Sequence, residues 1–422
     1  MKVLWITNCP FPETAKDLSL PRPLSQGWVL DICHRLAASG EVRLCVVSPG
    51  EVGELKYLSF GGTEHYVIPK PGRFHGKNFY AAYIKKIFEA FYPDIIHIFG
   101  TENDLGTAVI NSYPDIPVLL TIQGVMDRIS KEYYGGISLW EMLKYRTMRE
   151  NLRFGGMLFA KIRLNKQCKT EYETLQKITH VTGRTLWDYS VMKRINPKIK
   201  YHRCNFNLRE QFYDAPKWEL DKAQRHTIYT GYADYPLKGL HVLLLALEIV
   251  KKSYPDVKLY VPGVPGDDSG GLIVNTGYKK LIRDRIAKSG IQSNVVFTGP
   301  LSAEKVIDRM LKSHVVVLPS AIEGASATVC EGMYLGLPCI CAFRGGMTQL
   351  LRDGDSGFYY DYPEYGYLAE RIMRLFEDDD LSKRFSENVI KDASIRHDRQ
   401  KNPQMYLEVY REIIDEKREE IK

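Results

Sequence analysis

Long apolar runs are missing from this sequence of 422 residues, and so are the marks of a secreted protein. No apolar run approaches the roughly 20 residues that a membrane-spanning helix needs. The opening segment, residues 1–8, has the pattern of a strand and is interrupted too soon for a signal peptide. We therefore expect a cytoplasmic protein whose membrane contact, if any, is peripheral and on the inner face of the cytoplasmic membrane.

Metal-binding patterns are also lacking. The eight cysteines have no spacing typical of a zinc site, and several lie in apolar patterns where thiols behave as small core residues. An Asp-x-Asp pattern at Asp378–Asp380 falls between two expected helices, and we interpret it as a helix N-cap. The sequence therefore predicts no bound metal and fits a reducing cytoplasm.

Positive charge is concentrated in the first half of the chain. Through Asn205 there are 28 Lys and Arg against 19 Asp and Glu, although the whole chain carries a net charge of only +7. The excess indicates an anionic partner: a membrane surface, a nucleic acid or a phosphorylated acceptor. Residues 142–170 hold eight basic residues and one acidic residue, interleaved with apolar ones. Such a segment binds anionic lipid or forms a solvated helix face, and no nucleic-acid motif accompanies it.

The stretch from Pro319 to Gly354 carries the strongest signal. A short apolar run before Pro319 predicts a buried parallel strand, and helical spacing follows from Ala327 to Gly336. Glu323 lies in the loop between them and Glu331 lies early in the helix. The two carboxylates suit the hydroxyl groups of a nucleotide sugar; the alternative is a solvated loop residue and a helix-start acid.

The loop between the two glutamates is suited to phosphate. Its residues are small, which lets the backbone approach a ligand, and the N–H groups at a helix start attract anions. These residues are Gly324, Ala325, Ser326, Ala327 and Thr328.

The stretch contains, in this order, the motifs P-S, E-G-x-S, E-G-M-x-x-G-x-P and G-G. This order resembles the E-x7-E signature of the retaining family 4 glycosyltransferases. The resemblance implies an α/β protein of the GT-B fold, with two Rossmann-like, doubly wound parallel sheets facing across a cleft. The expected domains are residues 1–205 for the acceptor and 206–402 for the donor. A last helix at about 403–422 would cross back to the first domain.

The resemblance extends over the second domain. Lys238 and Gly239, after an expected strand ending at Gly231, resemble the family's diphosphate clamp, although Tyr232 or Ala233 stands where the family has Arg. In the family two further strand ends lie against the nucleotide base. Here these are Gly263 and the pair Gly299 and Pro300.

Five residues of the first domain are expected on the acceptor side. These are Gly27, Trp28, His97, Gln123 and Arg184. Arg184 is included because an arginine in a loop after a strand could contact an acceptor or a phosphate. Gln123 stands where the family often has His, so it keeps hydrogen bonding and loses proton transfer. For His97 a hydrogen-bonded histidine closing a strand is the alternative, and for Arg184 a pair with a carboxylate.

The resemblance implies a retaining, metal-independent hexosyltransferase that needs no cofactor. It would move a sugar from a nucleotide-diphosphate sugar, with UDP favoured over GDP, to a saccharide or lipid-linked saccharide acceptor in surface polysaccharide or glycoconjugate synthesis. Lys238 would stabilise the leaving diphosphate, Glu323 would orient the sugar and Glu331 would hold the ribose. An inactive sugar-nucleotide-binding partner, or an epimerase or hydrolase on the same fold, remains as the alternative.

Overall fold

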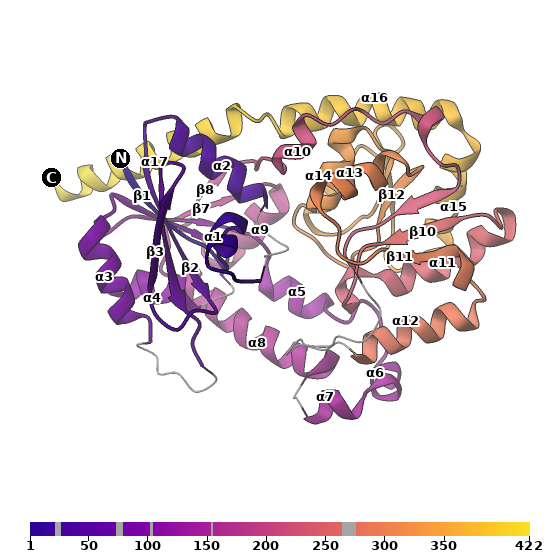
Figure 1. Cartoon of the computed structure of the whole chain (residues 1–422), viewed down its shortest axis with the longest axis horizontal. Coiled ribbons are helices and arrows are strands. Elements are labelled where there is room, and N and C mark those ends of the chain that lie inside the picture. Colours follow the sequence, from indigo (N-terminus) through magenta and orange to yellow (C-terminus); the bar gives the residue numbers. More distant parts are fainter. Residues whose placement is uncertain (22–26, 73–78, 102–103, 153–154, 264–275) are drawn as a thin grey trace. The chain divides into compact units, whose positions relative to one another are not determined.

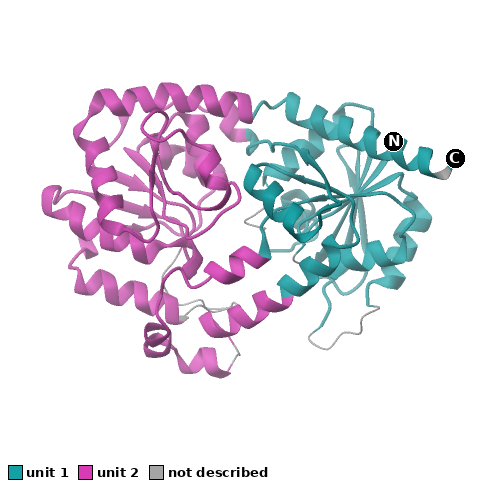
Figure 2. Cartoon of the chain, turned by 180° about the vertical axis from the view of Figure 1, so that it is seen from behind, with its two compact units in different colours: residues 1–126, 167–210, 397–422 teal, residues 127–166, 211–396 magenta. Residues whose placement is uncertain are grey.

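The computed structural model describes the chain except residues 22–26, 73–78, 102–103, 153–154 and 264–275. The chain forms two compact units (Figure 2). Unit 1 contains residues 1–126, 167–210 and 397–422, and unit 2 contains residues 127–166 and 211–396. Among the described residues no helix is both long and apolar enough to cross a bilayer.

Unit 1 is built on a sheet of eight strands in the order β3-β4-β2-β1-β5-β6-β7-β8. All neighbours pair in parallel except β3 with β4. The chain leaves β1 toward β2 on one side and later continues from β5 on the other, which is a doubly wound topology. The strands are β1 (Lys2–Ile6), β2 (Arg43–Gly50), β3 (Lys56–Phe60), β4 (Thr63–Pro69), β5 (Ile95–Phe99), β6 (Val118–Thr121), β7 (His180–Gly183) and β8 (Lys200–Arg203).

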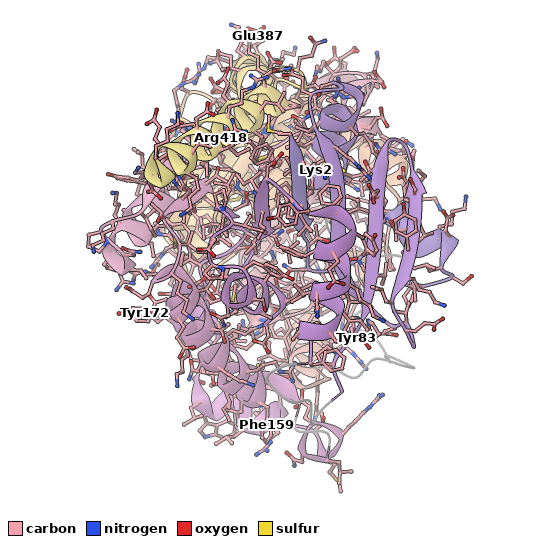
Figure 3. The ribbon with its side chains drawn as sticks, turned by 90° about the vertical axis from the view of Figure 1, so that its left-hand side faces the viewer. Lys2, Tyr83, Phe159, Tyr172, Glu387 and Arg418 are labelled. Atoms are coloured by element: carbon pink, nitrogen blue, oxygen red, sulfur yellow. The ribbon has the colours of Figure 1, made fainter. Side chains whose placement is uncertain are left out.

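Helices cover both faces of this sheet (Figure 1). They are α1 (Pro12–Asp17), α2 (Gly27–Ala38), α3 (Ala81–Phe91), α4 (Asp104–Ser112), α9 (Leu186–Ile195) and α17 (Lys401–Ile421), with α10 (Glu210–Tyr213) at the unit boundary. Successive side chains of β1 point to opposite faces of the sheet. Leu4 and Ile6 pack with α3 and α4 on one face. Trp5 points to the other face, where its indole N–H donates to the hydroxyl of Tyr410 of α17 at 3.0 Å. Figure 3 labels Lys2 on β1 and Arg418 on α17.

Unit 2 is built on a wholly parallel sheet of six strands in the order β11-β10-β9-β12-β13-β14. The strands are β9 (Thr227–Tyr229), β10 (Lys258–Val261), β11 (Val295–Phe297), β12 (Val315–Leu318), β13 (Cys339–Ala342) and β14 (Phe358–Tyr360). The first strand, β9, lies in the middle, and the order of the chain reverses between β9 and β12. Ligands of such sheets bind beyond the strand ends at this reversal.

The helices of unit 2 include two groups. The first group comes from residues before 167: α5 (Met126–Glu132), α6 (Leu139–Tyr145), α7 (Met148–Leu152) and the start of α8 (Gly156–Leu175). The second group is α11 (Leu240–Ser253), α12 (Thr276–Lys288), α13 (Ala303–Leu311), α14 (Ala327–Leu335), α15 (Tyr365–Glu377) and α16 (Asp379–Arg396), with four short 3-10 turns, η1 (Leu220–Lys222), η2 (Pro236–Lys238), η3 (Gln292–Asn294) and η4 (Gly345–Gln349).

The two units differ from the sequence-based domain division in three segments. Residues 206–210 and 397–402, expected in the second domain, belong to unit 1. Residues 127–166, expected in the first domain, pack in unit 2, where Arg285 of α12 donates to Glu141 of α6 at 2.8 Å. The region 196–218 contains the strand β8 and the short helix α10. Residues 397–422, which contain the last helix, belong to unit 1.

Candidate functional site

The predicted donor-side residues of unit 2 lie at one edge of its sheet. Because β9, β10, β12 and β13 are parallel, the loops that follow them leave from the same edge. Gly231, Gly263 and Glu323 follow β9, β10 and β12 in this order. The fold therefore places residues that are up to about 90 positions apart in the sequence beside one another.

Two glycines allow these loops to touch. Gly239 has a left-handed φ of 69°, and a Cβ built on it would lie 1.7 Å from the carbonyl oxygen of Pro319. A Cβ on Gly231 would lie 2.7 Å from Oγ1 of Thr328 at the start of α14. Only glycine tolerates such approaches, so these contacts draw η2 and the β9 loop onto the segment that carries Glu323.

An ion pair joins two of the predicted residues. Nζ of Lys238, at the end of η2, lies 2.5 Å from Oε1 of Glu323, and the hydroxyl of Ser320 donates to the same oxygen at 3.1 Å. The two side chains are 23% and 18% exposed, so the pair is shielded and still reachable from solvent. The site thus holds an ammonium and a carboxylate in fixed positions.

The charge of Lys238 is maintained by its surroundings. Burial by itself lowers the pKa of this ammonium, but the Glu323 carboxylate and the nearby Tyr235 outweigh burial and raise the pKa above its ordinary value. Tyr235 also places its ring 5.7 Å from Nζ. Lys238 is therefore cationic throughout the physiological pH range, as a group that binds phosphate must be.

The Gly345 and Gly346 pair supports Glu323 from the other side. The N–H of Gly346 donates to the carbonyl of Glu323 at 2.9 Å, and a Cβ on Gly345 would lie 2.4 Å from that carbonyl oxygen. The G-G pair was noted in the sequence, but no role in positioning Glu323 was predicted for it. Such a contact between distant loops leaves no local signal.

The start of α14 presents the expected backbone donors. Ser326 is the N-cap residue and makes no side-chain capping bond, so the first N–H groups of the helix are not occupied by it. Ala327 is exposed, and Gly324, Ala325 and Thr328 are half-buried. A helix start of this kind binds anions through its N–H groups and its dipole. Glu331, predicted as an acceptor, lies within α14 and is 5% exposed.

The remaining donor-side residues also lie at this edge. Gly263 and Gly299 exchange two backbone hydrogen bonds, of 3.3 and 3.2 Å, and Pro300 next to them is exposed. One neighbour was missed by sequence reasoning. Lys279 of α12 is 4% exposed and lies 3.6 Å from Asp234, two residues after Tyr232. Lys279 and Asp234 are 45 positions apart in the sequence, so no local pattern predicts that they pair.

His97 does not occupy a ligand-facing position. It is fully buried within β5, its Nδ1 lies 2.6 Å from the hydroxyl of Tyr410 and its Nε2 lies 2.6 Å from the hydroxyl of Thr121. Burial holds its pKa well below the ordinary value, so the ring is neutral. The buried and hydrogen-bonded ring fits the alternative of a histidine that closes a strand, and strand alternation directs it toward α17. An acceptor-side role for His97 stays a prediction.

Two of the other acceptor-side candidates follow strand ends of unit 1, and two open a helix. Gln123 follows β6, Arg184 follows β7, and Gly27 and Trp28 open α2. The guanidinium carbon of Arg184 lies 5.4 Å from the centre of the Trp28 ring. Arg184 has no carboxylate partner within the described chain, so the alternative that it forms an ion pair is not met there.

The described residues contain no cluster of three or more His, Cys, Asp or Glu side chains that could hold a metal ion. The Asp-x-Asp pattern caps a helix as expected, because the carboxylate of Asp378 accepts from the N–H of Leu381 at 2.8 Å. Asp379 pairs with Arg225 at 2.5 Å. Among the described residues, Lys238 is a cation of this site, and the start of α14 adds backbone N–H groups.

Comparison with known families gives a match to most of the C-terminal part of unit 2. Residues 213–392 match the family described as glycosyl transferases group 1. A D-inositol 3-phosphate glycosyltransferase of Corynebacterium kroppenstedtii is 31% identical over 158 residues, which cover 37% of this chain and 34% of that protein. An alpha-D-kanosaminyltransferase of Streptomyces kanamyceticus is 25% identical over 223 residues, covering 51% of this chain and 55% of that protein. The matches thus span between a third and about half of these relatives.

Solved structures match over nearly the whole chain. Sucrose-phosphate synthase from Thermosynechococcus elongatus has a TM-score of 0.72 at 12% identity and covers 98% of this chain and 99% of its own. The Anabaena protein HepE, solved in complex with UDP and glucose, has a TM-score of 0.66 at 16% identity and covers 97% of this chain and 99% of its own. At these identities the likeness shows a common fold.

We expect Gly345→Ala to destabilise the protein more than Gly354→Ala. Both glycines have left-handed φ angles, 60° and 74°, so both substitutions carry the same backbone strain of about 1 kcal/mol. Only at Gly345 would the new methyl group meet the carbonyl of Glu323; no atom lies within 4 Å of a Cβ on Gly354. Thermal melting of both variants measures the difference, and equal melting temperatures would contradict the supporting role of Gly345.

Proposed function

We propose that this chain, whose residues 213–392 match the glycosyl transferases group 1 family and whose fold is GT-B, transfers a sugar from a nucleotide-diphosphate sugar to a saccharide or lipid-linked saccharide. The observation that carries the proposal is the shielded Lys238–Glu323 pair beside the free start of α14. Phosphate oxygens match the cation and the N–H groups, and sugar hydroxyls match the carboxylate.

The proposed reaction proceeds with retention at the anomeric carbon. The bond from this carbon to the phosphate oxygen breaks, and the acceptor oxygen forms its bond on the same face. The acceptor proton passes to the departing phosphate oxygen. Lys238 has three N–H donors, so it can keep Glu323 and bind a phosphate oxygen at the same time. Together with the start of α14 it stabilises the charge that develops on the diphosphate.

The two glutamates have different proposed roles. Glu323, held by Lys238, Ser320 and Gly346, orients the transferred sugar through its hydroxyls. Glu331, on α14, accepts hydrogen bonds from the ribose diol. UDP is the proposed nucleotide, in line with the UDP-bound neighbour HepE.

Donor binding tests the proposal directly. Thermal melting with a panel of UDP- and GDP-sugars should show a higher melting temperature with a UDP-sugar, because a ligand present at 100 times its Kd stabilises the native state by about 2.7 kcal/mol. Glu331→Ala should weaken this binding by roughly 1.5–3 kcal/mol, whereas Glu323→Ala should lower kcat more than binding. Glu387→Ala, an exposed residue of α16, is the control. If neither glutamate variant differs from this control, the assignment is wrong.

A second experiment separates transfer from the alternatives. Calorimetry with a UDP-sugar, combined with an assay for released UDP, distinguishes a transferase from an inactive binding partner, which would bind without turnover. An epimerase would convert the donor without releasing UDP. Transfer predicts that turnover rises when an acceptor is added.

We expect activity to persist in excess EDTA. Lys238 and the N–H groups of α14 supply the positive charge that a divalent cation provides in metal-dependent transferases. The measurement compares initial rates with and without EDTA after exhaustive dialysis. Loss of activity that magnesium or manganese restores would refute metal independence.

A membrane surface is the proposed location of the acceptor. Exposed apolar side chains lie just before the basic segment 142–170 and within its first residues: Leu139, Trp140, Leu143, Met148 and Leu152 are 53–80% exposed. Of the aromatic residues noted in the sequence, Phe159 is half-buried and Phe154 lies outside the described residues. On α6 the residues Trp140 and Leu143 are one turn apart and lie opposite the buried Met142 and Tyr145.

We expect the protein to sediment with vesicles of phosphatidylcholine and phosphatidylglycerol at low salt. The double variant Trp140→Ser, Leu143→Ser should sediment less, because it loses the apolar contact, and 0.5 M salt should weaken the wild type by screening the lipid charge. Ile395→Ser, which removes an apolar residue that is 80% exposed on α16, is the control. Absence of wild-type sedimentation at low salt would favour a soluble acceptor.

A further inference from the structure

Unit 1 contains a buried cation whose charge is not balanced within the described chain. Arg184 is 8% exposed, and its guanidinium donates only to the carbonyls of Ile122 and Gln123, at 3.3 and 3.4 Å. The nearby carboxylate of Asp188 is used by the backbone N–H groups of Arg184 and Thr185, as the cap of α9. Arginine is rarely buried to this extent without an anionic partner.

The guanidinium is held in a fixed orientation. The Trp28 ring lies 5.4 Å from its central carbon and the Phe206 ring 4.8 Å from it. Phe206 is anchored in turn, because its carbonyl accepts from His397 at 3.0 Å and from Asn402 at 3.2 Å. A planar cation held against two aromatic rings is preorganised to bind a planar or tetrahedral anion through two N–H groups.

Two donors lack acceptors here, one on the guanidinium itself and one on the neighbouring Gln123 side chain. Nε of Arg184 and Nε2 of Gln123 are both buried without a hydrogen-bond partner in the described part of unit 1. The amide oxygen of Gln123 already accepts from Asn8 at 3.1 Å, which leaves its N–H₂ group as the free end. Buried donors are normally satisfied. These two belong to residues that are joined by the hydrogen bond from Arg184 to the Gln123 carbonyl, so together they indicate a ligand that brings acceptors.

The position of these groups suits a ligand. Asn8, Gln123 and Arg184 follow β1, β6 and β7, whose parallel strands end at the same edge of the sheet. Ligands of doubly wound sheets bind at this edge. We propose that Arg184 and Gln123 form a subsite for an anionic group, a carboxylate or a phosphate, on the acceptor. The acceptor role rests on the proposed sugar transfer, whereas the anion binding does not.

Calorimetry with small probes tests the subsite. Glucuronate, glucose 6-phosphate and glucose share a sugar ring and differ in charge, so the first two distinguish a carboxylate from a phosphate. We expect at least one of them to bind about tenfold or more tightly than glucose, as a charged hydrogen-bonded contact does. Arg184→Gln should abolish the preference, and Arg184→Lys should retain part of it because the charge remains without the planar fork.

Two further variants serve as controls. Gln123→Glu places a carboxylate beside the guanidinium, so it should raise the melting temperature and remove the preference for anions even if Arg184→Gln fails to fold. Lys85→Gln removes one exposed charge of unit 1 elsewhere and should change nothing. An unchanged preference in Gln123→Glu, or no preference in the wild type, would overturn the inference.

The outcome is independent of the proposed function. UDP-sugar binding, measured on the same samples, reports on unit 2 and should be the same in Arg184→Gln and the wild type. Binding of UDP-sugar with no preference for anionic probes refutes only the subsite. A preference for anionic probes without any binding of a nucleotide sugar supports the subsite and refutes sugar transfer.

Discussion

The close approach of three backbone segments at one sheet edge is the constraint on which the candidate site of unit 2 depends. Gly239 admits the carbonyl of Pro319, and Gly345 admits the carbonyl of Glu323, so the loop that carries Glu323 is fixed on both sides. Lys238 precedes the first of these glycines, and its ammonium is therefore brought to the carboxylate by the fold itself. The ion pair is held by contacts within the chain itself, as preorganised electrostatics requires.

The start of α14 supplies positive charge that the ion pair of this site does not. Lys238 and Glu323 neutralise each other, so the pair alone would attract a diphosphate only weakly. The start of α14 adds a partial positive charge of about half a unit together with N–H groups that its N-cap side chain does not occupy. In the proposed function the cation would thus orient the diphosphate, and the helix start would supply much of the net attraction.

Sequence reasoning predicted what is local. The alternation of apolar strands with amphipathic helices, the loop carrying Glu323, the Lys238–Gly239 turn and the cap at Asp378 all have signals within a few residues, and the structure contains them. Contacts between distant segments were not predictable in this way. His97 matched a family pattern, yet its burial depends on Tyr410, more than 300 positions away. The packing of residues 127–166 in unit 2 depends on contacts with α12 that no local pattern encodes.

The buried charge of Arg184 accounts for Gln123, which stands where the family 4 glycosyltransferases often have histidine. A protonated histidine next to the guanidinium of Arg184 would add a second buried charge of the same sign, and a carboxylate would neutralise the first. A neutral amide whose oxygen is already bonded to Asn8 does neither, and presents only a donor. Gln123 in place of histidine, and the buried charge of Arg184, are therefore both explained if an anion from outside the chain binds here.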